Sequence, residues 1–322
     1  MLRNRFLILG TLLALSVVGY MTLGAVGSWS FLIPFRASKL AALALVSVCL
    51  AVSTVLFQTI TANRILTPSV MGFDALYVFI LTAIVHSFGA AGYAAIPAPL
   101  LFVMNLVLMT GMGLVLFSLL IKGGRGDILK MVLTGIVLGI LIRALTGFLQ
   151  RMIDPSEFQT IQSVSFARFT YVDKLNLAMA AVVALPALVM AWRMRHRLDV
   201  IALGPVAATG LGETPKRGQR QALVLICLLT ASATALAGPM SSGGAGPSSF
   251  FGLIVAALAH MITPSYKHSV LLPSAAMLAC ITLIGGQTVM ERVLHLSTPL
   301  AVVIEVLGGI TFLILLLKRR MA

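Results

Sequence analysis

Very few residues in this chain are placed for covalent chemistry. The five histidines share no spacing that would hold a metal ion. The three cysteines, Cys49, Cys227 and Cys280, lie in separate apolar stretches without a CxxC pair. The sequence has no Walker A, HExxH or GxSxG pattern, so it indicates neither a nucleotide hydrolase nor a common protease or esterase. We therefore expect no catalytic residue, no cofactor and no metal site.

Charged residues inside or beside apolar stretches could instead guide or relay an ion. Arg143 and Glu305 each interrupt a stretch of membrane-spanning length, where a charge is costly unless it is paired or hydrated. Asp74 lies near the start of another stretch, and Arg168 lies in a polar segment. For Arg143 and Arg168 the sequence leaves open a pathway role, attracting an anionic solute, and a structural ion pair. Structural pairing is favoured for Glu305 over a proton path, and Asp74 fits an interfacial position as well.

The elements that carry these charges are predicted to be membrane helices. Apolar residues make up 59% of the chain, more than a soluble domain of this length could bury. We predict an all-α, polytopic membrane protein of about ten transmembrane helices, forming one membrane domain over residues 1–322. The predicted helices are 5–25, 38–62, 69–89, 97–121, 128–150, 174–193, 221–240, 249–262, 271–290 and 299–317. The eighth is short and follows the Gly- and Pro-rich stretch 238–247, which indicates a discontinuous helix.

The distribution of charge predicts the orientation. Most of the 23 basic residues fall in segments that lie on one side of the membrane, and the positive-inside rule assigns that side to the cytoplasm. Both termini are then cytoplasmic. Arg3 and Arg5 before an apolar run could also start a cleaved signal peptide, but the run is long enough to span, which favours a retained helix. Two loops are long: an outer loop at about 151–173 and an inner loop at about 193–220.

Three stretches carry motifs in the order and spacing of one transporter family. The first, 58–77, has Asn63, Pro68 and Gly72 at the family spacing. The second, 246–255, is similar to G-P-I-G-F-V-G-L-I-V. The third comprises His268, Leu271, Leu272 and Pro273, followed by Gly308, Gly309 and Phe312. Together these stretches resemble the permease subunits of iron-siderophore and vitamin B12 ABC importers, often called the FecCD family.

The chain also departs from the family pattern. Ala256 and Ala257 replace the usual proline and histidine, and about eight extra residues precede the second motif. Asp74 stands where serine is commoner. Residues 67–77 resemble a subgroup that serves catecholate or related siderophores.

The resemblance implies a fold and a function. It implies the type II ABC importer permease fold in the bacterial inner membrane, with a second permease copy or paralogue completing the pathway. A periplasmic or lipid-anchored binding protein would deliver a ferric siderophore, and cytoplasmic ATPase subunits would supply the free energy, so this chain would not be an enzyme. Vitamin B12 or haem remains an alternative cargo. A proton-driven secondary transporter, with Glu305, Asp74 and Arg143 as the relay, is the alternative from another class.

Two sets of residues match contact sites of the family. Arg36, Lys39 and Arg292 match the outer basic residues that meet the binding protein, although basic residues at a membrane interface can also simply snorkel. In the inner loop, a L-G-x-x-A-x-x-L-G-like element matches the contact with the ATPase, and a solvated basic loop is the alternative. The residues of this element are Leu203, Gly204, Pro205, Ala208, Leu211 and Gly212.

Overall fold

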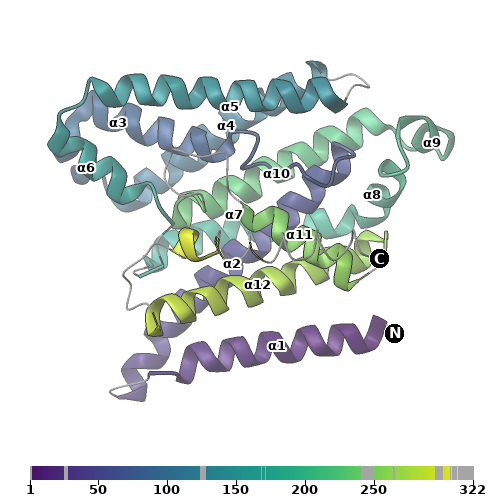
Figure 1. Ribbon diagram of the computed structural model, residues 1–322, viewed down its shortest axis with the longest axis horizontal. Helices are drawn as coiled ribbons and strands as arrows, with labels where there is room; N and C mark the ends of the chain where they lie inside the picture. The colour runs from purple at the N-terminus through teal and green to yellow at the C-terminus, as the bar shows by residue number, and fades with distance from the viewer. Residues whose placement is uncertain are drawn as a thin grey trace.

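The long helices of the protein run roughly from left to right in Figure 1, between two ends of the molecule. The computed structural model describes residues 2–24, 28–123, 128–167, 169–170, 172–240, 250–263, 265–293, 300–304, 306 and 310. Within these residues every regular element is a helix, which confirms the all-α prediction. The elements are α1 (Leu2–Thr22), α2 (Trp29–Ile60), α3 (Phe73–Ala95), α4 (Ala98–Gly123), α5 (Ile128–Arg151), α6 (Pro155–Val164), α7 (Lys174–Arg193), α8 (Arg195–Ile201), α9 (Pro205–Gly210), α10 (Pro215–Ala237), α11 (Phe250–Ile262) and α12 (His268–Arg292).

Eight of the described helices are long and apolar enough to cross a membrane, and α11 is a shorter apolar helix. These nine correspond in order to the first nine predicted helices. The tenth prediction, 299–317, lies mostly outside the described residues, of which 300–304 are helical. The chain is therefore a multi-pass membrane protein.

Some boundaries differ from the prediction for local reasons. α2 begins at Trp29, well before residue 38, and continues through Pro34, which lies inside the helix. α3 extends to Ala95 because Gly89 adopts a φ of 72° and lets the helix continue after a kink. The loop at 151–173 contains α6, which was not predicted, and the inner loop forms the short helices α8 and α9.

The core of the bundle is formed by α2, α10 and α12. In the most apolar segment of α2, 72% is buried inside the protein, against 11% in that of α1 and 17% in that of α5. α2 packs against both α10 and α12, while α7 packs against α10 through a stripe of small residues. This stripe consists of Ala180, Ala184, Ala187 and Ala191. Small side chains let membrane helices approach closely, and the apolar outer faces of α1, α5 and α7 can remain in lipid.

The two ends of the bundle are distinct in Figure 1. We call one the α6 end, which comprises α6, the C-terminal end of α1, the N-terminal end of α2 and the C-terminal end of α12. We call the other the α9 end, which comprises the N-terminal end of α1, α8, α9 and the start of α12.

The peripheral helix α1 packs against α12 and α2. At the α9 end, Arg5 Nη1 donates a hydrogen bond to the carbonyl oxygen of Ile262, the last residue of α11, over 2.5 Å. This contact anchors the first spanning helix to an element far along the chain.

Candidate docking and coupling sites

At the α6 end, Arg36 is an internal cap. It is only 6% exposed, and its guanidinium donates hydrogen bonds of 2.9–3.0 Å to four carbonyl oxygens at the C-terminal end of α1. The acceptors belong to Tyr20, Met21, Leu23 and Gly24. The last carbonyls of a helix lack partners within the helix, and a basic side chain suits their partial negative charge. Arg36 therefore fixes the C-terminal end of α1 against α2.

Lys39 lies one turn further along α2 and is also engaged. Its Nζ is 3.5 Å from Glu291 Oε1 on α12 and 4.5 Å from the centre of the Phe35 ring. Glu291 Oε1 also accepts a hydrogen bond of 2.7 Å from Gln287 Nε2. The ion pair joins α2 to α12, and sequence analysis missed Glu291. The spacing of Gln287 and Glu291, one helical turn apart, was its only sequence signal.

Arg292 completes the basic cluster. It is half-buried, and its guanidinium lies so close to Gly24 that a Cβ on this glycine would be 2.7 Å from Arg292 Nη1. Arg36 binds the carbonyl of the same Gly24. The structure therefore brings Arg36, Lys39 and Arg292 together beside the C-terminal end of α1, although their environments differ.

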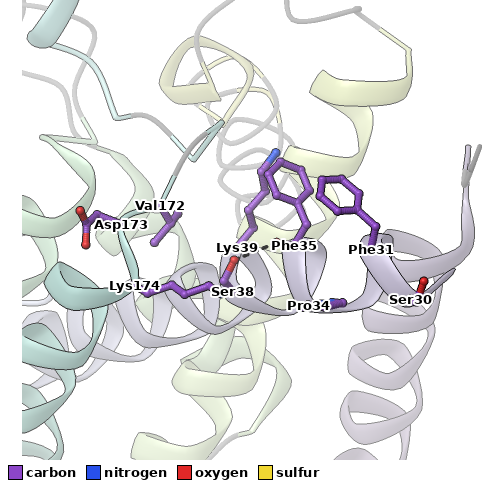
Figure 2. A pocket seen from close by; sticks show the side chains of 9 residues that line it. All are labelled: Ser30, Phe31, Pro34, Phe35, Ser38, Lys39, Val172, Asp173 and Lys174. Carbon is purple, nitrogen blue, oxygen red and sulfur yellow. Dashed lines mark hydrogen bonds between the residues drawn. The ribbon is translucent and has the colours of Figure 1, made fainter. Parts of the chain in front are cut away.

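A hollow of about 550 Å³ opens beside this cluster (Figure 2). It lies between the N-terminal half of α2 and residues 172–174. Phe31, Phe35 and Lys39 point to the same side of α2, and the two rings stack at 6.0 Å. Asp173 caps α7, because its Oδ1 accepts hydrogen bonds from the backbone N–H groups of Leu175 and Asn176.

At the α9 end, the predicted coupling element forms α9 and its two turns. Gly204 and Gly212 flank the helix with φ of 93° and 82°, conformations that favour glycine, and Pro205 occupies the first turn. Ala208 is fully buried and seats the helix. Three large apolar side chains remain exposed: Leu203 at 63%, Val206 at 87% and Leu211 at 64%. We call these three residues the apolar tip.

Arg197 holds this loop in shape. Its guanidinium donates to both carboxylate oxygens of Glu213 over 2.6–3.2 Å and to Gln221 Oε1 on α10 over 2.6 Å. These hydrogen bonds hold the pKa of Glu213 below its usual range, and the pKa of Arg197 is raised in turn. Sequence analysis did not single out Arg197 or Glu213, because their pairing depends on how α8 and the turn after α9 fold back.

Of the four residues considered for a pathway, the structure describes two. Asp74 is buried in the first turn of α3, and Arg143 is half-buried on α5. α3 and α5 meet where Gly72 touches Gly139, and the Arg143 guanidinium lies 3.4 Å from the position of a Cβ on Gly139. Asp74 follows Gly72 by two residues, and Arg143 lies one helical turn after Gly139. Arg168 and Glu305 lie outside the described residues.

The architecture has a counterpart among solved transporters. A structure described as an inward-facing conformation of a putative metal-chelate type ABC transporter matches with a TM-score of 0.81. The match covers 99% of this chain and 100% of that chain at 20% identity. The fold is thus that of an ABC transporter permease.

Sequence relatives define the family within this class. The model of the FecCD transport family matches residues 6–318. The petrobactin import system permease protein YclO of Bacillus subtilis (strain 168) is 38% identical over 95% of both chains. The corresponding protein FatC of Bacillus anthracis is 30% identical over 99% of this chain and 90% of its own. The chain belongs to the FecCD transport family, which confirms the resemblance found in its motifs.

Proposed function

We propose that this chain is the inner-membrane permease subunit of an ABC importer for ferric siderophores, and that petrobactin is the first cargo to test. The main support for this proposal is the 38% identity, over nearly the full length of both chains, to a permease named for petrobactin import. The chain forms one membrane domain and supplies the pathway, while partner ATPases hydrolyse ATP.

The orientation follows from the two ends of the bundle. Basic residues gather at the α9 end, on both sides of α8 and at the start of α10, and the positive-inside rule assigns this end to the cytoplasm. The N-terminus of α1 is then cytoplasmic, and the α6 end faces outward. The C-terminus shares the cytoplasmic side when the predicted last helix crosses the membrane once.

The apolar tip is the contact for an ATPase subunit. An exposed group of Leu203, Val206 and Leu211 on a loop outside the membrane is unfavourable in water and indicates a covered surface. Arg197 and the buried Ala208 keep the tip rigid, so a push on α9 moves the loop as a unit. A merely solvated basic loop would not need three apolar side chains at its apex.

The basic cluster at the α6 end is the contact for the binding protein. Arg292 meets acidic groups of the partner directly, while Arg36 and Lys39 fix the ends of α1 and α12 beside it. Lipid snorkelling accounts less well for Arg36 and Lys39, because both reach protein groups instead of the membrane surface. Charges at such a contact steer association even when each pair adds little affinity.

The substrate pathway is completed by a second permease, either a second copy or a paralogue. We place Arg143, Arg168, Asp74 and Glu305 along or beside this pathway. The close packing of α3 on α5, where Gly72 meets Gly139, supports a structural role for this contact beside the pathway.

The test is uptake of radioactive iron by cells that carry the transporter and lack other siderophore importers. Ferric petrobactin should enter, and deletion of this permease should abolish entry. Depleting ATP should stop uptake, whereas an ionophore that collapses the proton gradient at constant ATP should spare it. The opposite pattern would establish a proton-driven transporter. Uptake of vitamin B12 or haem instead of ferric siderophore would keep the importer and change the cargo.

A further inference from the structure

A carboxylate in the inner loop caps a membrane helix at the α9 end. Asp199 lies on α8, and its Oδ1 accepts hydrogen bonds from the backbone N–H of His268 at 2.7 Å and from His268 Nδ1 at 2.6 Å. α12 begins at His268, and the preceding residue Lys267 makes no side-chain cap of its own. Asp199 therefore performs for α12, from a distant element, the role that an N-cap residue performs locally.

The ring of His268 extends this contact to a third element. Its Nε2 lies 2.7 Å from the hydroxyl oxygen of Thr59, in the last turn of α2. The ring is only 3% exposed, and both of its nitrogens have a partner. α8 also packs directly against α2 and α12. Asp199, His268 and Thr59 together form what we call the inner joint, which connects the loop to two helices of the core.

The same two helices are tied again at the opposite end. There the Lys39–Glu291 ion pair joins α2 to α12. At a rise of 1.5 Å per residue, the 25 residues of α12 span about 37 Å. α2 and α12 thus form a pair of antiparallel rods that is fastened both at the inner joint and beside the basic cluster.

We infer that Asp199 is the positioning residue through which movement of α8 and α9 reaches the α2–α12 pair, and through it the α6 end. The inference rests on the proposed function, because it assigns the movement to contact with an ATPase. When α8 shifts, the pair has to follow, or a buried imidazole and a helix N-terminus lose their partners. Leaving such groups unpaired is costly, so the joint resists opening and transmits the shift.

A cap that only stabilised α12 would behave differently from this joint. Removal of a simple cap lowers stability and leaves unchanged the amount of iron imported per ATP hydrolysed. Removal of a transmitting contact lowers this ratio while the complex stays assembled. The two roles therefore separate in a measurement of coupling at equal assembly.

The experiment uses the complete transporter, with ATPase subunits, both permeases and binding protein, reconstituted in lipid vesicles. Assembly is checked by size-exclusion chromatography, and ATP hydrolysis and iron uptake are measured on the same vesicles. For Asp199→Ala we expect assembly and basal hydrolysis as in the wild type, with iron imported per ATP reduced about tenfold. Asp199→Asn, which keeps an acceptor of the same size, should retain most of the coupling. His196→Ala, an exposed change on the same helix, is the matched control.

Thr59→Val tests the second arm without changing a charge. It removes the hydroxyl that meets the ring and should also lower the yield of iron per ATP. In the double variant with Asp199→Ala the two losses should not add, because both changes open one joint. Additive losses would overturn the inference.

The other possible results distinguish a failure of the inference from a failure of the proposed function. An Asp199→Ala transporter with wild-type yield of iron per ATP would overturn the inference. The inference would also be overturned if Asp199→Ala lost assembly and hydrolysis while Thr59→Val assembled and kept the wild-type yield of iron per ATP. A wild-type complex that imports no iron with ATP would overturn the proposed function itself, before any variant is compared.

Discussion

The two ends of this permease use their basic residues differently. At the α6 end, Arg36 and Lys39 bind groups of neighbouring helices within the protein, and Arg292 remains partly accessible beside them. At the α9 end, Arg197 stabilises the inner loop through Glu213 and Gln221, and the exposed surface of that loop is the apolar tip. Charges suit a contact that must form quickly and release, whereas a rigid apolar tip suits a contact that must transmit force.

The largest expected effect is at the apolar tip. Val206→Asp places a charge in the centre of the proposed ATPase contact, and we expect the affinity for the ATPase to fall about 100-fold, as for a hot-spot residue. Val206 is 87% exposed, so the fold should be unaffected. Binding of purified ATPase to the permease in detergent measures this, with Ser163→Asp on the exposed side of α6 as the control. Unchanged affinity would place the ATPase elsewhere.

Arg36→Ala should act on stability. It leaves four carbonyl oxygens at the end of α1 without their donor, and we expect a loss of about 2–3 kcal/mol in unfolding free energy. Thermal unfolding in detergent measures it, and Arg36→Lys should recover part of the loss. A variant of normal stability that binds the binding protein poorly would show instead that Arg36 is a direct contact.

Arg292→Glu should act on docking. We expect an affinity for the binding protein about tenfold lower at low salt, and a smaller difference at high salt, because exposed charges are screened. Arg151→Glu reverses an exposed charge on the C-terminal turn of α5 and should have little effect. Equal losses in both variants would indicate general attraction without a defined contact.

The smallest expected effect concerns the Arg197–Glu213 ion pair of the inner loop. Because the folded-state pKa of Glu213 is lowered, its pairing with Arg197 stabilises the loop above the unfolded-state pKa of about 4.3. This contribution is lost as the pH falls through the folded-state pKa. Amide hydrogen exchange in α8 and α9 should be faster in Glu213→Gln than in the wild type at neutral pH. Glu157→Gln, in α6, should leave this exchange unchanged.

In acid below the folded-state pKa, the wild type and Glu213→Gln should exchange at similar rates. The Arg197 side chain is 36% exposed, so solvent screening keeps the effect small. A difference between the two proteins that persists in acid would contradict the assignment.

Sequence patterns predicted the spanning helices because lipid imposes their length and composition. They also indicated the inner-loop element at which α9 forms, whereas Arg36 and Lys39 lie within α2 and Arg292 is the last residue of α12. The helix α6 was missed although Asp154, Pro155 and Glu157 form an ordinary helix start, since the segment is too short and polar to resemble a span.

The partners of charged side chains were harder to foresee. Glu157 Oε1 accepts from the backbone N–H of Ala90, just after the kink at Gly89, and Asp199 meets His268. These pairs are 67 and 69 residues apart, and no local pattern indicates which distant groups will meet. Arg36 is the instructive case. The sequence indicated a basic residue at the outer side of the membrane, but its acceptors are backbone carbonyls of α1, and no side-chain pattern reveals them.

The packing of α1 against α12 has a consequence for biogenesis. α1 is made well before its main neighbour α12, which begins only at His268. At about 5–20 residues per second, synthesis of the intervening chain takes on the order of tens of seconds. During that interval α1 lacks its main packing partner, and the hydrogen bonds of Arg36 hold its C-terminal end near α2. The full packing of α1 can therefore form only after most of the chain has been made.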